Sequence, residues 1–462
     1  MKLSSFIFLI LLVTYGYSRS DIQIGHQVTV AVPTEYVMGF IGRAFLIETD
    51  QMTPNFRVAM SVEAINGKYS CSLQVFLGDV KVWDSGHYSH FYTSDKCILE
   101  LTLEGDLRLK GPKERVGWKT GTSGQGVERL QLLRTGNLVL VDVLDHIKWQ
   151  SFHFPTDVML WGQRLDVATR LTSFLSNSSE FYSFEVQNNK IALYLNSGKL
   201  RYSYWEFNPS KNRSINFVEL SASGLELFNE KYKKMGQIPS QGLYPLRFLA
   251  LKNETGNFGL YFYSPDREKF EASFQALNST CDLPMSCKAY GICTFSSTCA
   301  CLPLPTKENK GNFSCNSEIS GGFCSDKQAE MLELEGVSSV LKDDPKMVNI
   351  SREACENLCL EDCKCAAALY SSGKEASDIQ QCFLYRLVMG LKQVEKGDGF
   401  SYMIKVPKGT GGGHGRSSLK KWVLVVVGVV DGLIILLVVG GLGYYFMQKR
   451  RKNSSHSDGN TS

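Results

Sequence analysis

The chain has 462 residues, of which 43% are hydrophobic and 21% are charged, and its formal net charge is +4. So small a positive charge on a chain of this length does not imply a nucleic-acid partner. The even number of 14 cysteines points instead to disulfide bonds in an oxidising compartment, with zinc sites as the weaker alternative.

The N-terminus has the pattern of a cleavable secretory signal. Lys2 precedes an apolar run over residues 6–13, and the small residues Gly16, Ser18 and Ser20 follow. This pattern predicts a signal peptide at 1–20 that is cleaved after Ser18 or Ser20, because about ten apolar residues are too few to span a bilayer. The alternative interpretation is a buried N-terminal helix.

A second apolar segment, residues 422–447, is long enough to cross a membrane. As a helix, residues 423–446 would extend about 36 Å, against a bilayer core of about 30 Å. The basic residues 449–452 follow directly and predict that the tail, 448–462, is cytosolic. We therefore expect a single-pass type I protein of the plasma membrane with its N-terminal part outside the cell.

One charged residue, Asp431, interrupts this apolar segment. A central Asp costs about 2.5–3.5 kcal/mol, which the many Val, Ile and Leu residues at about 0.3–0.6 kcal/mol each outweigh. At helical spacing Gly428, Asp431 and Gly432 share one face. One hypothesis is that this face associates with a partner helix, and the other is that the Asp is hydrated by a local bilayer defect.

Short runs of alternating apolar residues fill the region from 21 to 280. The runs GDLRLKG (105–111), TGNLVLVD (135–142), SGLELFNE (223–230) and TGNFGLYFY (255–263) each place a glycine before a period-two pattern. Glycine followed by alternation predicts hairpins and strands, and its recurrence predicts a repeated unit around a pseudo-symmetric core. We expect two similar all-β domains, at 21–160 and 161–280.

The region after residue 280 is rich in cysteine and poor in large apolar residues. Residues 281–323 would be held mainly by crosslinks. In 324–406 the spacing of Cys355, Cys359 and Cys363 predicts one face of a short helix capped by Ser351. Residues 407–421 form a glycine-rich stalk. Six glycosylation sequons fit an extracellular location, at Asn177, Asn212, Asn253, Asn278, Asn312 and Asn349.

These segments resemble a known plant family. LRTGNLVLVD followed by WQSFHFPTDVMLWGQRL (149–165) is similar to the bulb-type lectin segment of S-locus glycoproteins and S-domain receptor kinases. The cysteine run from 281 resembles their EGF-like module, and CENLCLEDCKCAAALY with Cys382 resembles their PAN (apple) module. The group that the chain resembles most is the kinase-less, membrane-anchored, PAN-domain-containing S-domain proteins. The resemblance implies a mainly β chain with two β-prism lectin domains, an EGF-like module and an α+β PAN domain.

The resemblance also implies a disulfide pattern. It gives Cys71–Cys97, Cys281–Cys293, Cys287–Cys299, Cys355–Cys382 and Cys359–Cys365, with Cys301–Cys315 as a plausible further pair. Cys324 and Cys363 then remain as the last pair. The pairing among Cys301, Cys315, Cys324 and Cys363 stays open.

The lectin-like strands retain little of a sugar site. Mannose-binding lectins of this fold use Q-x-D-x-N-x-V-x-Y, whose polar residues share one strand face. On 133–141 only Asn137 and Val139 match, on 253–261 only Asn257 and Tyr261 match, and on 102–110 nothing matches. Each lost hydrogen bond costs about 1–3 kcal/mol, so we expect degenerate strands that hardly bind mannose. The VWDSGH stretch (82–87) also departs from the family's VWxANR.

No pattern of a catalytic site accompanies these modules. Phosphate-loop, HExxH and GxSxG patterns are absent from the sequence, so we expect no enzyme and no cofactor. His87 and His90 beside Tyr88 could suggest a metal, but a solvated strand or loop is the simpler interpretation. Three carboxylates are interpreted as turn and cap residues rather than as acid/base partners: Asp142, Asp145 and Asp157.

The sequence therefore predicts a non-enzymatic, receptor-like cell-surface glycoprotein. Its ectodomain would bind a protein or a glycan, or would self-associate, and a partner receptor kinase would signal. The alternative is a decoy or wall-associated carbohydrate-binding glycoprotein without a signalling role.

Overall fold

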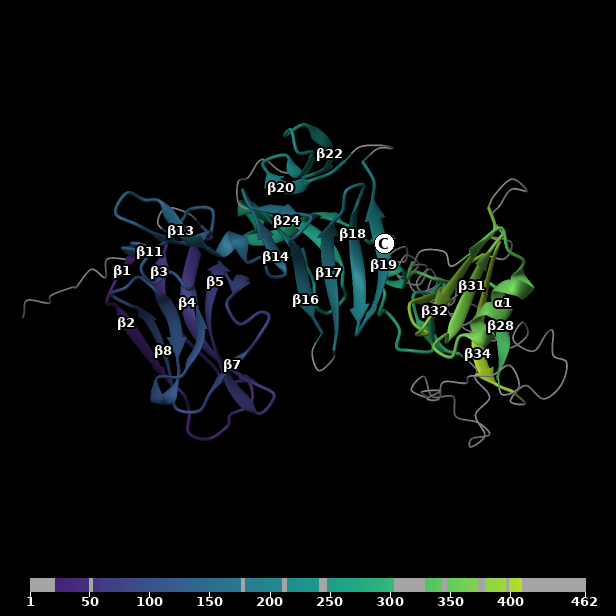
Figure 1. The fold of residues 1–462 in the computed structure, drawn as a ribbon, viewed down its shortest axis with the longest axis horizontal. Helices are drawn as coiled ribbons and strands as arrows, with labels where there is room; N and C mark the ends of the chain where they lie inside the picture. Colours follow the sequence, from purple (N-terminus) through teal and green to yellow (C-terminus); the bar gives the residue numbers. More distant parts are fainter. Residues whose placement is uncertain are drawn as a thin grey trace, which may run out of the picture. The chain divides into compact units, whose positions relative to one another are not determined.

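The computed structural model describes residues 21–49, 53–175, 179–209, 214–240, 247–302, 329–342, 347–372, 379–395 and 399–408 (Figure 1). These residues are mainly β, which confirms the predicted fold class at that level. The predicted leader, membrane segment and tail, and the predicted stalk from residue 409 on, lie outside the described residues. Within the described ranges, no helix has both the length and the apolar character needed to cross a membrane.

Residues 21–150 build three antiparallel sheets, the first sheet group. One sheet has the order β1 (Asp21–Gln23), β11 (Arg129–Leu132), β12 (Leu138–Val141), β13 (Ile147–Gln150). The second has the order β10 (Val116–Lys119), β9 (Leu107–Lys110), β8 (Lys96–Leu101), β2 (Gln27–Ala31). The third has the order β3 (Ile41–Glu48), β4 (Phe56–Ile65), β5 (Lys68–Leu77), β6 (Val80–Asp84), with β7 (Phe91–Thr93) paired to β5.

The repeated G-x-L-x-L runs provide the core of this group. Leu107 and Leu109 of β9 and Leu138 and Leu140 of β12 are fully buried in one hydrophobic cluster. Alternate side chains of a strand point to one face, so each run delivers two leucines to the shared interior. The glycine that precedes each run takes a left-handed turn conformation, for example Gly136 with φ +83°.

The second sheet group repeats the three-sheet arrangement. One sheet has the order β14 (Val158–Leu160), β23 (Arg247–Leu251), β24 (Phe258–Ser264), β25 (Lys269–Gln275). The second has the order β15 (Arg164–Asp166), β20 (Phe217–Ser221), β21 (Gly224–Phe228), β22 (Lys234–Pro239). The third has the order β16 (Arg170–Phe174), β17 (Glu180–Val186), β18 (Ile191–Ser197), β19 (Leu200–Phe207). The 3-10 turns are η1 (Pro112–Glu114), η2 (Ser151–His153), η3 (Pro265–Arg267) and η4 (Thr280–Asp282).

The expected boundary after residue 160 differs from the strand pairing. β14 covers Val158–Leu160 and pairs antiparallel with β23, so these residues join the second sheet group. Val158, Leu160 and Phe248 nevertheless pack in the same hydrophobic cluster as the first group. We propose a boundary just before Val158, because hydrogen bonding rather than core packing separates the two groups there.

The remaining described strands form two further sheets around one helix, the C-terminal sheets. One has the order β27 (Cys299–Cys301), β26 (Gly291–Cys293), β33 (Leu391–Gln393), β29 (Val337–Ser339). The other has the order β28 (Ala329–Leu334), β34 (Phe400–Pro407), β31 (Ala367–Ser371), β32 (Gln381–Tyr385), β30 (Met347–Val348), and α1 (Arg352–Glu361) packs against it. Because β26 pairs with β33, the two predicted modules at 281–323 and 324–406 share a sheet.

Disulfides join five of the predicted pairs. The bonds Cys71–Cys97, Cys281–Cys293, Cys287–Cys299, Cys355–Cys382 and Cys359–Cys365 are formed, which confirms these assignments. Cys301 is also disulfide-bonded, while its expected partner Cys315 lies outside the described residues.

The expectation for Cys363 is wrong in the structure. Cys363 is a free, exposed cysteine, so the last predicted pair is not formed, and Cys324 lies outside the described residues. The helix begins as predicted, with the Ser351 hydroxyl accepting from the Ala354 N–H at 3.2 Å. It ends at Glu361, however, so Cys355 and Cys359 share its buried face and Cys363 follows the C-cap. Because α1 ends before residue 363, the helix carries only the first two of the three cysteines that were expected on one of its faces.

Candidate functional site

The first candidate for a sugar strand, β12, uses its polar residue inside the fold. Asn137 is 5% exposed, and its Nδ2 donates to Gln150 Oε1 at 2.7 Å. Its Oδ1 accepts from Ser151 Oγ at 3.2 Å and from the Phe152 N–H at 3.3 Å. Val139 is completely buried. Asn137 thus ties the turn before β12 to the end of β13 and to η2, while Val139 is part of the buried interior.

The strand β24 shows the same arrangement. Asn257 Nδ2 donates to the Leu277 carbonyl at 2.7 Å, and Oδ1 accepts from the Leu277 N–H at 3.1 Å. The Tyr261 ring stacks on Phe248, with 5.2 Å between centroids. Just before β9 the equivalent residue, Asp106, accepts from the Gly121 N–H at 2.8 Å. The polar residue after each of these three turn glycines therefore forms hydrogen bonds with the segment that follows the next strand of its sheet.

The carboxylates at 142 and 145 are turn residues, as predicted. Asp142 Oδ1 accepts from the N–H groups of Leu144 and His146, each at 2.9 Å, and Lys148 Nζ lies 3.0 Å from Oδ2. The hydrogen bond from Lys148, with those from the loop backbone, holds the pKa of Asp142 well below its usual range. Asp145 pairs with Arg129 across the same turn.

His87 and Asp157 do not fit the predicted interpretation as solvated or simple turn residues. His87 Nε2 lies 2.8 Å from the Thr172 carbonyl, and the neighbouring Tyr88 hydroxyl donates to the Pro155 carbonyl at 2.8 Å. Burial lowers the pKa of His87, although the charge of Asp157 opposes this, and burial raises the pKa of Asp157. His87, from the first sheet group, thus contacts Thr172 of the second, and Asp157 lies in the segment that links the two groups. His90 remains exposed.

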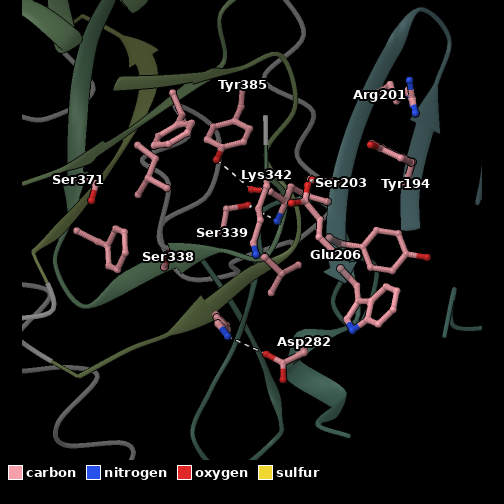
Figure 2. A pocket seen from close by; sticks show the side chains of 18 of the residues that line it. Tyr194, Arg201, Ser203, Glu206, Asp282, Ser338, Ser339, Lys342, Ser371 and Tyr385 are labelled. Carbon is pink, nitrogen blue, oxygen red and sulfur yellow. Dashed lines mark hydrogen bonds and ion pairs between the residues drawn. The ribbon is translucent and has the colours of Figure 1, made fainter. Parts of the chain in front are cut away.

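A cavity of about 1270 Å³ lies beside β19. We call it the β19 cavity. Its walls come from β18 and β19 of the second sheet group and from the C-terminal sheets (Figure 2). The side chains labelled in the figure are Tyr194, Arg201, Ser203, Glu206, Asp282, Ser338, Ser339, Lys342, Ser371 and Tyr385.

Backbone pairing joins the two walls of the β19 cavity. The Ser203 N–H donates to the Lys342 carbonyl at 2.9 Å, and the Lys342 N–H donates back to the Ser203 carbonyl at 2.6 Å. Beneath this bridge the Tyr385 hydroxyl donates to the Leu341 carbonyl at 3.0 Å, and the Tyr202 hydroxyl accepts from the Arg386 N–H at 3.1 Å. The two walls are thus held by specific polar contacts.

Charged side chains on the cavity walls are arranged in pairs. Lys190 Nζ lies 2.8 Å from Glu206 Oε1, and the Ser203 hydroxyl donates to the same oxygen at 2.8 Å. Burial alone would raise the pKa of Glu206, but the hydrogen bonds from Lys190 and Ser203 lower it overall. Lys392 pairs with Asp282 at 2.7 Å.

Arg201 occupies a different position on the wall. Its guanidinium lies 3.7 Å from the centroid of the Tyr194 ring and pairs with Glu185 (Figure 2). Gln187 Nε2 donates to the Tyr194 hydroxyl at 2.6 Å. The Arg201 guanidinium thus covers one face of the Tyr194 ring in the cavity wall.

Sequence reasoning missed the β19 cavity because its residues come from distant parts of the chain. The strand RYSYWEF (201–207) mixes aromatic, hydroxyl and charged residues, which was the only local signal. Nothing in the sequence places residues 338–342 beside it. Across the described ranges, no cluster of three or more His, Cys, Asp or Glu side chains could hold a metal ion.

Other predicted positions are only partly described. Asn253, Asn278 and Asn349 are exposed, while Asn177, Asn212 and Asn312 lie outside the described residues. Gly428, Asp431 and Gly432 also lie outside them.

Comparison with known proteins finds similar sequences and structures. A family model described as D-mannose binding lectin matches residues 82–180. A PAN domain-containing protein of Arabidopsis thaliana is 27% identical over 59% of this chain and 58% of its own length. The Arabidopsis G-type lectin S-receptor-like serine/threonine-protein kinase SD2-5 is 25% identical over 75% of this chain and 43% of its own length. This chain is similar to the plant S-domain proteins.

This S-domain relative spans about half the length of these two curated proteins. Among solved structures, a monomeric mannose-binding lectin from Gastrodia elata is 20% identical and covers 29% of this chain and 96% of its own, with a TM-score of 0.19. A two-domain lectin from Scilla campanulata is 15% identical and covers 54% of this chain and 99% of its own, with a TM-score of 0.19.

Proposed function

We propose that this S-domain relative is a non-enzymatic, receptor-like glycoprotein of the cell surface whose β-rich part recognises a ligand. The observation that carries the proposal is the β19 cavity. Its walls offer hydroxyl, amide, charged and aromatic side chains from two parts of the fold, and polar groups that converge in a cavity can orient a ligand. The carboxylates on its walls are paired with lysines, which supports binding rather than acid/base chemistry.

A carbohydrate is the ligand class that the similarity to the D-mannose binding lectin model favours. Mannose itself is not the expected sugar. Leu133, Thr135 and Val141 replace the Gln, Asp and Tyr of the mannose pattern, and Asn137 is already engaged with Gln150. We therefore expect that Asn137→Ala does not reduce any binding to mannose on a glycan array.

A receptor-like role draws on the S-domain relatives, among which is a receptor-like kinase. We propose a plasma-membrane location with the described modules outside the cell. Signalling would depend on a partner, either a receptor kinase or a second copy of the chain. The face of Gly428, Asp431 and Gly432 is the proposed contact within the membrane.

Co-purification of the full-length chain tests this role. The tagged chain, solubilised with detergent from plant membranes, should recover a receptor kinase, and an Asp431→Leu variant should recover less of it. A variant at an exposed site outside the membrane segment, Lys119→Gln, is the matched control. Recovery of wall polysaccharide without any kinase would favour the wall-associated alternative.

A further inference from the structure

We propose that the β19 cavity binds an acidic oligosaccharide, whose carboxylates are drawn to Lys342. The inference rests on the proposed recognition function and names the ligand class of its site. It is independent of the mannose pattern, because none of Asn137, Val139, Asn257 and Tyr261 lines this cavity.

The charge on the cavity walls favours an anion. Among the described residues that line the cavity, four side chains are cationic and two are anionic. Lys190 and Lys392 each pair with one of the two carboxylates, and Arg201 pairs with Glu185. Lys342 is exposed and makes no ion pair with another described residue. Its charge acts on Glu206 without a direct contact, so among the described residues Lys342 is the lining cation that no carboxylate holds in an ion pair.

The remaining lining suits sugar rings. The hydroxyls of Ser203, Ser339 and Ser371 and the amide of Asn189 supply hydrogen-bonding groups for vicinal hydroxyls. Trp205 is half-buried and offers an aromatic surface. At about 1270 Å³ the cavity exceeds the roughly 300–1,000 Å³ that is typical for drug-sized ligands. A ligand of several rings therefore fits it better than a monosaccharide.

The edge of β19 argues against an acidic peptide as the ligand. Extended peptides bind sheets mainly by adding a strand to an open edge. Here the backbone of Ser203, in the middle of β19, is already paired with Lys342. A ligand along this wall must be held by side chains, which is how sugars are recognised.

Binding to the purified full-length chain tests the proposal. The probe is a hexamer of galacturonic acid, compared with its fully methyl-esterified hexamer and with hexaglutamate. We expect the acid hexamer to bind most tightly, and to bind more weakly as salt is raised. Lys342→Met should weaken binding about fivefold, as for the loss of one exposed ion pair, and Lys342→Glu should weaken it further.

A matched control separates this effect from a general change in charge. Lys231→Glu alters an exposed turn of the same sheet group outside the cavity and should leave affinity unchanged. Equal thermal unfolding of the Lys342 variants and the wild type verifies that they fold. Equal binding of the esterified hexamer, or no effect of Lys342→Glu, would overturn the proposal.

Two further outcomes separate this inference from the proposed function. If hexaglutamate bound with the same dependence on Lys342, the saccharide assignment would be wrong and the ligand class would be an acidic peptide. Failure of the acid hexamer to bind, while the full-length chain still recovers a receptor kinase, would overturn the ligand assignment and leave the receptor role standing.

Discussion

Asn137 illustrates how a residue of a sugar-binding pattern can serve the fold alone. Its amide bonds to Gln150, Ser151 and the Phe152 backbone, and it is almost fully buried. Asn137→Ala should therefore reduce the local stability where the start of β12 meets the end of β13 and η2 by about 2–3 kcal/mol, since buried partners lose their hydrogen bonds. Hydrogen exchange at the Phe152 amide measures this change. The exposed Asn189→Ala should cost less than about 0.5 kcal/mol, and an equal cost at both sites would contradict the assigned role.

A second prediction at the residue scale concerns the turn glycine Gly136. A Cβ at this position would lie 2.4 Å from the Phe56 ring and 2.7 Å from Leu160 Cδ1, in a backbone with φ +83°. Gly162 has nearly the same φ, +81°, but nothing within 4 Å of its Cβ position. We expect Gly162→Ala to cost about 1 kcal/mol for the left-handed conformation, and Gly136→Ala to cost about 1–3 kcal/mol more. Thermal unfolding of the two variants gives the comparison, and equal losses would exclude the contact with Phe56.

At the scale of elements, α1 is stabilised at its C-terminus by a residue from a distant strand. Lys405 of β34 is 5% exposed, and its Nζ donates to the carbonyls of Cys359, Leu360 and Asp362 at 3.0–3.1 Å. Carbonyls at a helix end lack partners within the helix, and a cation there is favourable.

Replacing this lysine should loosen the helix end without changing its crosslinks. Lys405→Met keeps the aliphatic bulk but removes three charge-assisted hydrogen bonds, for which we expect a loss of about 2–3 kcal/mol. The amides in the last turn of α1 should then exchange faster. Lys364→Met, at an exposed position just after the helix, is the control. Unchanged exchange in the Lys405 variant would mean that water replaces the ammonium group without cost.

The sequence was informative about elements whose signal is local. The G-x-L-x-L runs predicted strands β9, β12, β21 and β24, because alternation and a turn glycine act over a few residues. The Ser351 cap and the pair Cys355 and Cys359 were predictable for the same reason. The end of α1 was not, because its cap comes from Lys405, more than forty residues further along the chain. The C-terminal position of Cys363 was missed with it.

At the scale of the whole molecule, the sequence predicted modules but not what forms between them. The β19 cavity depends on the pairing of Ser203 with Lys342, and the β26–β33 pairing joins two segments that were expected to be separate modules. Such contacts have no periodic signature. The resemblance supplied the order of the modules and five disulfide pairs, whereas the candidate binding residues emerged only from the arrangement in space.

The contact of His87 with the second sheet group should respond to pH. His87 contacts the Thr172 carbonyl and is influenced by Asp157, Asp84 and Lys81. Burial lowers the pKa of His87, so the folded state favours the neutral imidazole. Its contribution to stability is present above about pH 6.5, the pKa of an unperturbed His, and is lost as the pH falls below that value and the unfolded chain takes up a proton.

Asp157 acts in the opposite direction, and a variant of His87 can separate the two effects. Because burial raises the pKa of Asp157, its stabilising contribution is present below the unfolded pKa of about 3.9 and is lost as the pH rises through the folded value. Between pH 7.5 and pH 5, the wild type should therefore lose more thermal stability than His87→Gln, which has no imidazole to protonate. The exposed His153→Gln should follow the wild type. Equal losses of stability in His87→Gln and the wild type would contradict the prediction. They would mean that the His87 imidazole takes up a proton as easily in the folded chain as in the unfolded one.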